Sequence, residues 1–514
     1  MEEHAIGGEK VKLDKELADY SECTGCGACY SVCDLRAIQM IEDRSSHFYY
    51  PDVDTKKCIE CGNCVNICPV INKSTEFVGV KRTYAANNKK SEMRMISASG
   101  GMFGALASQV ISEGGAVAGV RYEGVEKCKH HIVTSEEGLR ELCGTKYFQS
   151  ESQNIYGELE EYSDRCNIVM FCGTPCQVDA AKRYAALKHF SDKLFTVEIL
   201  CRGVSPALLH QKFIAHLQNK YGKRIVSVQY KEKTRGWNNI GTLIHLEDGT
   251  EKYVSREGNY LARLAYDLNL SIRESCYNCN YKQMKRYADI TIGDFWGLKD
   301  SPLLDNKGTS FVMVNTKKGE ELFEKTADKL DFYACDSDAI WSGNPNGFNQ
   351  VKCEKKIREA LWSSLNEGED IGVVTERLQR MILDSKTKRQ KQLIDKDNRI
   401  MELYERWIIG CSHGENVGQF LLNNGINHIA VQGFGTLGRA VSEVIQQNGV
   451  IVDYIIESDK SRWNEGKCRF YTTHDELPAV DAVIVTAITS FDEISRKLKE
   501  KLVCPILSME DIVP

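Results

Sequence analysis

The sequence lacks the features that would place a protein in a membrane or on nucleic acid. It has no apolar run near the ~20 residues that a membrane helix needs. It has no dense basic stripe, and a formal net charge of −6 on 514 residues gives no sign of a polyanionic partner. The first residues, MEEHAIGGEKVKLDKELAD, contain no apolar core of a signal peptide. We therefore expect a cytoplasmic protein that binds neither a membrane nor nucleic acid.

Cysteine, in contrast, is abundant. The chain has 21 cysteines, and eight of them lie between Cys23 and Cys68. In a reducing compartment, such a set indicates metal ligands or catalytic thiols rather than disulfides.

The eight N-terminal cysteines form two runs of the same spacing. The runs are Cys23-x2-Cys26-x2-Cys29-x3-Cys33 and Cys58-x2-Cys61-x2-Cys64-x3-Cys68. This spacing is typical of proteins with two 4Fe–4S clusters, in which the last cysteine of each run ligates the cluster of the other run. The predicted ligand sets are Cys23, Cys26, Cys29 and Cys68 for one cluster, and Cys58, Cys61, Cys64 and Cys33 for the other. Zinc is the alternative, but zinc sites normally separate two CxxC pairs.

This segment resembles bacterial two-cluster ferredoxins, with one departure. Asp34 stands after Cys33, whereas Pro69 follows Cys68. The departure loosens one turn and removes no ligand.

The middle of the chain contains four phrases with plausible chemistry. They are SASGGMFGALA (97–107), GTKYFQS (144–150), FCGTPCQV (171–178) with LCRGVSP (200–206), and RESCYNCNYKQMKRYADITIGDFWG (273–297). Two glycines before a helix offer free N–H groups to a phosphate. Two of the cysteines follow apolar strands, at the strand ends where αβ folds place their sites.

Together these phrases resemble the coenzyme F420 hydrogenase/dehydrogenase beta-subunit family, over roughly residues 20–345. Members are flavoproteins that move electrons between iron–sulfur clusters and a two-electron partner through FAD or FMN. The resemblance implies that the flavin is lined by Ser99, Gly100, Gly101, Gly144, Thr145, Lys146 and Tyr147, with Thr145 where serine is more usual. Lys146 is the candidate catalytic residue, and Asp289 and Asp294 match a motif that borders the site. A third cluster is implied at Cys176, Cys201, Cys276 and Cys279.

Each phrase also has an ordinary explanation. A Gly-Gly pair before a helix is often a turn, and a cysteine after an apolar strand is often a small buried hydrophobe. The CxxC at Cys276 could be a zinc half-site or a redox pair. We expect the other nine cysteines to serve packing, and among them Cys172 is the alternative to Cys176. These nine are Cys128, Cys143, Cys166, Cys172, Cys335, Cys353, Cys411, Cys468 and Cys504.

The last ninety residues contain a dinucleotide-binding pattern. A predicted strand, His428–Gln432, runs into Gly433-x-Gly435-x-x-Gly438, and a second strand, Ile451–Ile456, ends at Glu457. These glycines and the acidic residue match the fingerprint for NAD or a related nucleotide. With VDAVIVTA (480–487), we expect three or four strands, and the unit resembles small Rossmann-like modules of sugar-modifying enzymes. A fold kept for packing or dimerisation, with no ligand, is the alternative.

The pattern along the chain predicts a multidomain α/β protein. The expected segments are a two-cluster domain (1–80), a flavin-binding region (81–160), a region with the further cysteines (161–345), a helical linker (346–410) and a Rossmann-like module (411–514). Within them we expect a helix carrying Phe103, Leu106 and Val110, strands 168–171 and 194–200, a helix whose first residue is Pro206, and a hairpin over 242–254.

The expected function is a flavin and iron–sulfur oxidoreductase that exchanges electrons with an external ferredoxin or other redox protein and with a small-molecule substrate. The alternatives are a non-catalytic electron-transfer subunit and an accessory protein of polysaccharide biosynthesis. The sequence does not decide whether the flavin is FAD or FMN, what the substrate is, or whether the protein forms a homo-oligomer.

Overall fold

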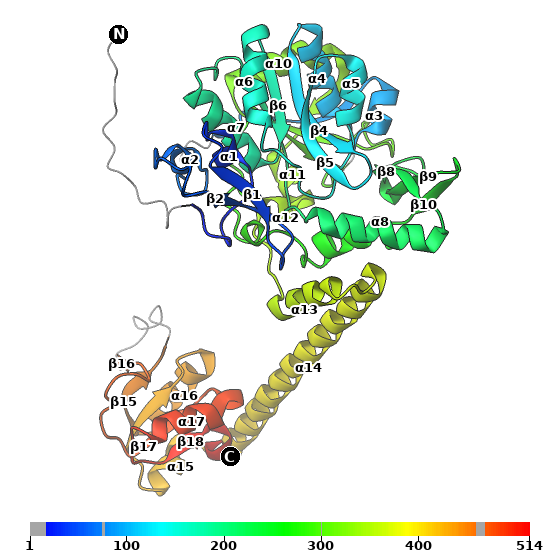
Figure 1. Cartoon of the computed structure of the whole chain (residues 1–514). Helices are drawn as coiled ribbons and strands as arrows, with labels where there is room; N and C mark the ends of the chain where they lie inside the picture. Colours follow the sequence, from blue (N-terminus) through cyan, green and yellow to red (C-terminus); the bar gives the residue numbers. More distant parts are fainter. Residues whose placement is uncertain (1–16, 74–77, 300, 459–467, 514) are drawn as a thin grey trace. The chain divides into compact units, whose positions relative to one another are not determined.

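The structure is a computed structural model that describes residues 17–73, 78–299, 301–458 and 468–513 (Figure 1). The chain divides into two compact units, Met1–Met381 and Ile382–Pro514. Residues 1–16, which contributed to the prediction that no signal peptide is present, lie outside the described residues. Within the described part, no helix has the length and apolar character needed to cross a bilayer.

The first unit mixes strands and helices. Its strands are β1 (Ile38–Glu42), β2 (Tyr49–Val53), β3 (Arg82–Asn88), β4 (Ala116–Glu123), β5 (Lys127–Val133), β6 (Val169–Gly173), β7 (Leu194–Ile199), β8 (Ile225–Glu232), β9 (Gly241–Leu246), β10 (Glu251–Val254), β11 (Ile290–Asp294), β12 (Ser310–Val314) and β13 (Leu330–Ala334). Its helices are α1 (Ala28–Ser31), α2 (Asn63–Ile67), α3 (Ser91–Ile96), α4 (Met102–Ser112), α5 (Glu136–Leu142), α6 (Ile155–Arg165), α7 (Pro175–Leu187), α8 (Ala207–Tyr221), α9 (Tyr260–Ala262), α10 (Lys317–Thr326), α11 (Ser337–Gly343), α12 (Pro345–Phe348) and α13 (Lys355–Asn366), followed by α14 (Ile371–Ser412), which continues into the second unit.

The two cysteine runs fold alike. Each leads into a short helix, α1 or α2, through a glycine in the left-handed conformation, Gly27 at φ 79° and Gly62 at φ 75°. Glycine adopts this conformation without the steric cost that a side chain adds. Between the runs, β1 and β2 pair antiparallel, with Ile38 opposite Val53. The repeated spacing therefore produces a repeated local structure.

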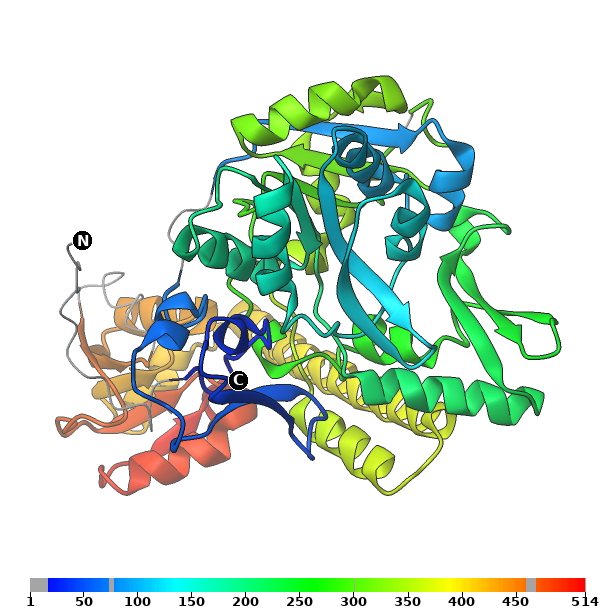
Figure 2. The same cartoon turned by 45° about the horizontal axis from the view of Figure 1, so that its top comes forward.

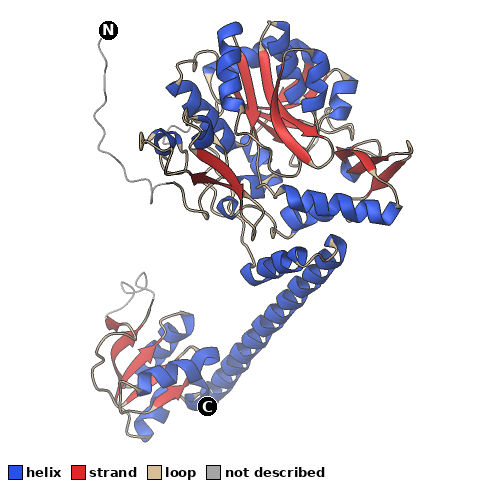
Figure 3. Ribbon diagram, viewed as in Figure 1, coloured by secondary structure: helices blue, strands red, loops and turns tan. Residues whose placement is uncertain are grey.

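An eight-stranded sheet forms the centre of the first unit, in the order β13-β3-β12-β11-β7-β6-β4-β5. The neighbours β11, β7, β6 and β4 run parallel. Along β6, Val169 and Phe171 belong to the apolar core beneath α6 and α7, whereas Met170 and Cys172 belong to the core beneath α4 and α10. Helices therefore cover both faces of the sheet (Figures 2 and 3), as is typical of buried parallel strands.

Several sequence predictions are confirmed here. The predicted strands 168–171 and 194–200 correspond to β6 and β7, and α4 carries the predicted apolar residues. The hairpin is β9–β10, which turns at Gly249 with φ 82°. Pro206 is the N-cap of α8 rather than its first residue, because its ψ of 156° is extended. The segments predicted as 81–160 and 161–345 contribute strands to one sheet.

The second unit contains a five-stranded parallel sheet in the order β16-β15-β14-β17-β18. Its elements are α15 (Val417–Asn423), β14 (His428–Gln432), α16 (Thr436–Gln447), β15 (Ile451–Ile456), β16 (Arg469–Tyr471), β17 (Ala482–Val485), α17 (Phe491–Lys499), β18 (Ile506–Ser508) and α18 (Met509–Ile512). The sequence predicted three or four strands. The short strands β16 and β18 have three residues each, too few to show a clear hydrophobic period.

Candidate functional site

The first predicted cluster set comes together at the base of α1 and the end of α2. Burial raises the pKa of the Cys29 thiol well above its usual value. The next contributions come from the thiols of Cys26, Cys23 and Cys68, so all four predicted ligands lie within electrostatic reach of one another. Cys23 and Cys26 are buried.

The second predicted set lies closer to solvent. Burial raises the pKa of Cys64, with further contributions from the thiols of Cys61 and Cys58. Cys61 is exposed. The sulfur of Cys33, the fourth predicted ligand, accepts a hydrogen bond from the backbone N–H of Ala37 at 3.3 Å, and the described contacts do not link it to the other three.

The third predicted set is built on two neighbouring parallel strands. Cys176 lies at the start of α7, directly after β6, and Cys201 follows β7, so the carboxyl ends of adjacent strands present both thiols at one edge. Burial, together with the neighbouring thiols of Cys279 and Cys276, raises the pKa of Cys176 to about 12. Burial also raises the pKa of Cys201, and the thiols of Cys276, Cys176 and Cys279 act in the same direction. The structure thus brings all four together.

Cys176, and not its alternative Cys172, lies with the other three cysteines of the third set. Burial raises the pKa of Cys172 to about 12, and its next contributions come from Cys143 and Lys146, not from the third set. The side chain of Cys172 packs in the core beneath α4. Cys176, in the first turn of the following helix α7, lies apart from this core.

A buried cation fits the chemistry of this third set. Lys282 lines the same cavity as the four cysteines, is 9% exposed, and its Nζ has no hydrogen-bond partner among the described residues. Burial lowers its pKa, while Cys201, Cys276 and Cys279 act in the opposite direction. A 4Fe–4S cluster with four thiolates carries net negative charge and would compensate this ammonium group, which a neutral environment would not. Among the described residues, no group of three or more His, Cys, Asp or Glu side chains is arranged to hold a single metal ion.

The four cysteines share a cavity of about 820 Å³ with most of the predicted flavin residues. The predicted residues that line it are Ser99, Gly101, Gly144, Thr145, Lys146, Tyr147 and Asp294. Gly101 is the N-cap of α4, with φ 81°. Helix N-termini present free N–H groups that favour phosphate, so the wall formed by α4 suits a phosphate-bearing ligand.

Two predicted flavin residues do not line the cavity. Gly100 packs against the sheet, where an added Cβ would lie 2.4 Å from the carbonyl oxygen of Ala86. The Asp289 carboxylate accepts hydrogen bonds from the backbone and hydroxyl of Thr196 and from the hydroxyl of Thr316. Both positions therefore have structural tasks that the motif did not distinguish from ligand contact.

The amine of Lys146 caps a helix. Its Nζ donates to the carbonyl oxygens of Cys143 at 2.8 Å and Leu142 at 3.2 Å, at the end of α5. Burial lowers its pKa to about 8. Elsewhere on the cavity wall, Tyr147 packs against Tyr266 with ring centroids 5.3 Å apart.

Sequence reasoning missed two tryptophans at this cavity. Trp237 and Trp296 both line it and stack with ring centroids 4.0 Å apart and an angle of 3°. Trp296 lies within the ADITIGDFWG phrase, which could have indicated it. The Asp294 carboxylate in that phrase pairs with Lys231.

The glycine-rich turn of the second unit has distinct roles for its residues. Gly433 has φ 90°, and an added Cβ at Gly438 would lie 1.9 Å from the carbonyl oxygen of Gly433. Gly435 is the N-cap of α16. The carboxylate of Glu457 accepts a hydrogen bond from the backbone N–H of Phe434 at 2.8 Å. The predicted acidic residue therefore contacts the glycine turn itself.

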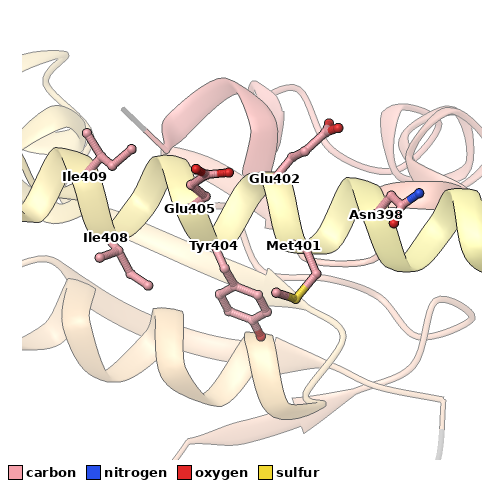
Figure 4. A pocket seen from close by; sticks show the side chains of 7 residues that line it. All are labelled: Asn398, Met401, Glu402, Tyr404, Glu405, Ile408 and Ile409. Carbon is pink, nitrogen blue, oxygen red and sulfur yellow. The ribbon is translucent and has the colours of Figure 1, made fainter.

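A second hollow, of about 510 Å³, lies along α14 in the second unit (Figure 4). It is lined by Asn398, Met401, Glu402, Tyr404, Glu405, Ile408 and Ile409. None of the predicted site residues lines it.

Comparison with known proteins agrees with the predicted resemblance. Residues 166–338 match the family model for the C terminus of the coenzyme F420 hydrogenase/dehydrogenase beta subunit. This part of the chain is similar to that beta-subunit domain. Residues 22–72 match the model of a 4Fe–4S dicluster domain. The chain is therefore related to subunits of an oxidoreductase family and contains a 4Fe–4S domain.

One relative and one solved structure illustrate the similarity. The F subunit of the F(420)H(2) dehydrogenase from Methanosarcina mazei is 22% identical over 329 residues, which cover 62% of this chain and 85% of the relative. A chain of the F420-reducing [NiFe] hydrogenase complex from Methanosarcina barkeri is 19% identical, with a TM-score of 0.35, over 56% of this chain and 94% of that chain.

Proposed function

We propose that the chain is an iron–sulfur flavoenzyme that relays electrons through three 4Fe–4S clusters to FAD or FMN in the 820 Å³ cavity. One observation carries the proposal. The third cysteine set and most of the predicted flavin residues line this same cavity. The family match over residues 166–338 and the dicluster match over 22–72 support it.

The cysteine sets suggest an order for the relay. Cys61 of the second set is exposed, whereas Cys23 and Cys26 of the first set are buried. The thiol of Cys176 contributes to raising the pKa of Cys26, after burial and Cys68, so the first and third sets adjoin. We therefore name the cluster of Cys58, Cys61, Cys64 and Cys33 the outer cluster, and that of Cys23, Cys26, Cys29 and Cys68 the inner cluster. Electrons would pass from outer to inner to third.

The cavity residues would bind the flavin in defined ways. The N-terminus of α4 at Gly101 would accept a phosphate group, and the aromatic ring of Tyr147 would contact the flavin. A bound flavin supplies the conversion between one-electron and two-electron transfer. Lys146, whose pKa burial lowers to about 8, is the residue we propose to hold a proton, at its Nζ, near neutral pH.

Anaerobic purification with quantified iron, sulfide and flavin tests this proposal. We expect about 12 irons and about 12 sulfides per chain, with one flavin. Turnover of the isolated chain with reduced viologen and a substrate panel then separates an enzyme from a subunit that only transfers electrons. The relative from Methanosarcina mazei is named as a dehydrogenase subunit, which favours an external redox partner for this chain. Protein that binds no flavin, or zinc instead of iron, would refute the proposal.

A second candidate function concerns the five-stranded unit. We propose that its glycine turn binds NAD or a related nucleotide, because Gly433 and Gly438 adopt the close approach of a dinucleotide turn. Calorimetric titration of the full chain with NADH, NADPH and a UDP-sugar tests it. Absence of binding at about millimolar concentration would leave the unit a packing or dimerisation element.

A further inference from the structure

Arg273 lies between the inner cluster residues and the third set. It stands three positions before Cys276, directly before the short helix Glu274–Cys276. Its side chain is 0% exposed, and it is among the largest fully buried side chains described in the protein. It is the first residue of the phrase that spans 273–297, but it is not one of the predicted site residues.

The guanidinium group is bound tightly to the Cys23 segment. Nε donates to the carbonyl oxygen of Cys23 at 2.6 Å, and Nη2 lies 3.6 Å from its sulfur and donates to the carbonyl oxygen of Tyr49 at 2.9 Å. Nη1 donates to Gln149 Oε1 at 3.1 Å. The ring of Tyr50 lies 4.1 Å from the guanidinium carbon. The hydroxyl of Ser275, two residues on, also donates to the Cys23 carbonyl, at 3.0 Å.

This arrangement is specific to the first cysteine run. A Cβ at Gly25 would lie 2.6 Å from Nε2 of Gln149 and 2.7 Å from Nη1 of Arg273, so a larger residue here would force these side chains to shift. The second run has Glu60 at the equivalent position. Within the described ranges, no Arg or Lys side chain donates to a sulfur of Cys58, Cys61 or Cys64; the sulfur of Cys58 accepts from the backbone N–H of Glu60.

The charge of Arg273 has no carboxylate to balance it among the described residues. The other fully buried arginine, Arg286, pairs with Glu198. An unpaired buried charge is costly, so such a group requires an anion nearby. The thiolate of Cys23 and the cluster that it would bind supply that negative charge.

We propose that Arg273 raises the reduction potential of the inner cluster and so favours the transfer of electrons inward. A positive charge and an N–H···S contact both favour the reduced, more negative cluster. One electron leaves the outer cluster and one arrives at the inner cluster, and a one-electron donor such as a reduced ferredoxin restores the outer cluster. No bond is made or broken. The inference rests on the proposed ligand sets of the two clusters.

An EPR-monitored redox titration of the full-length protein tests this role. The titration is carried out in a Cys61→Ala background, which removes the outer cluster. The EPR signal of the inner cluster can then be followed beside that of the third cluster alone. With Arg273→Gln, we expect the oxidised-to-reduced ratio of the inner cluster, at the wild-type midpoint, to rise at least tenfold. That change corresponds to a fall of about 59 mV in the midpoint potential of a one-electron couple. A lysine keeps the charge, so Arg273→Lys should shift the ratio less than threefold.

The matched control is Arg94→Gln, which removes another buried arginine, one that pairs with Asp305 and has no hydrogen bond to a cysteine sulfur in the part of the chain that the structure describes. It should leave the inner potential unchanged. An Arg273→Gln protein that keeps its inner iron with a ratio within threefold of wild type would overturn the inference, as would an equal shift in the control. If Arg273→Gln loses the inner cluster, Arg273→Lys decides: a shift below threefold supports the role of the charge, and a tenfold shift refutes it. A wild-type chain without two N-terminal clusters would instead overturn the proposed function.

Discussion

The proposed electron route depends on the proposed third cluster, and one pair of substitutions tests whether that cluster is present. Cys201→Ala removes a thiol that the structure places with Cys276, Cys176 and Cys279. A 4Fe–4S cluster needs its four ligands, so the iron content should fall from about 12 to about 8 atoms per chain. Removing one sulfur costs about 1 kcal/mol of packing. That is small beside the ~5–15 kcal/mol that stabilises a typical domain, and the fold should persist.

The matched control is Cys172→Ala. This thiol lines the same cavity and its pKa is likewise raised by burial, yet its electrostatic neighbours are Cys143 and Lys146. Its loss should leave about 12 irons. Both variants are purified anaerobically, and iron, acid-labile sulfide and flavin are measured per chain. Retention of all iron in Cys201→Ala would refute the ligand set, and loss of about four irons in Cys172→Ala would show that the strand end was misassigned.

Three further outcomes follow from the structure. Cys26→Ala and Cys61→Ala should each remove about four irons, and unchanged iron in both would contradict the two-cluster assignment. Gly435→Val should weaken nucleotide binding at least about tenfold, or ~1.4 kcal/mol, with iron and flavin content intact; equal affinity for wild type and variant by calorimetry would contradict it. Burial lowers the pKa of His130 and of His210 to about 4. The contribution of each neutral histidine to the free energy of unfolding is therefore complete above the unfolded pKa of about 6.5. It falls as the pH drops toward 4, and at about pH 5 each histidine has lost about 2 kcal/mol. A thermal unfolding midpoint that does not fall over this range would contradict that reasoning.

Local sequence was enough to predict what depends on neighbouring residues. The spacing of the two cysteine runs predicted the 4Fe–4S domain, because such ligand loops are short and continuous; the dicluster match confirms the domain. The strands at 168–171 and 428–432 were predicted from short apolar runs, because a buried parallel strand needs little else. The hairpin at Gly249 was predicted because its turn demands a left-handed residue.

The tertiary structure decided which motif residues reach the cavity. Ser99 and Gly101 line it while Gly100, between them, packs against β3, because successive residues at a helix start point in different directions. In the same way, the pleat of β6 turns Cys172 toward Lys146, whereas Cys176 follows the strand into the third set.

The tertiary structure alone also determined which charges are buried. In the sequence, Arg273 and Lys282 belong to one basic, polar stretch that would suit a solvated surface. In the fold, both are enclosed beside cysteines. Burial and charge compensation depend on segments more than a hundred residues apart, such as Cys23 and Arg273. Sequence spacing therefore predicts the ligands that lie close along the chain, while the potential and order of the proposed clusters depend on contacts that exist only after folding.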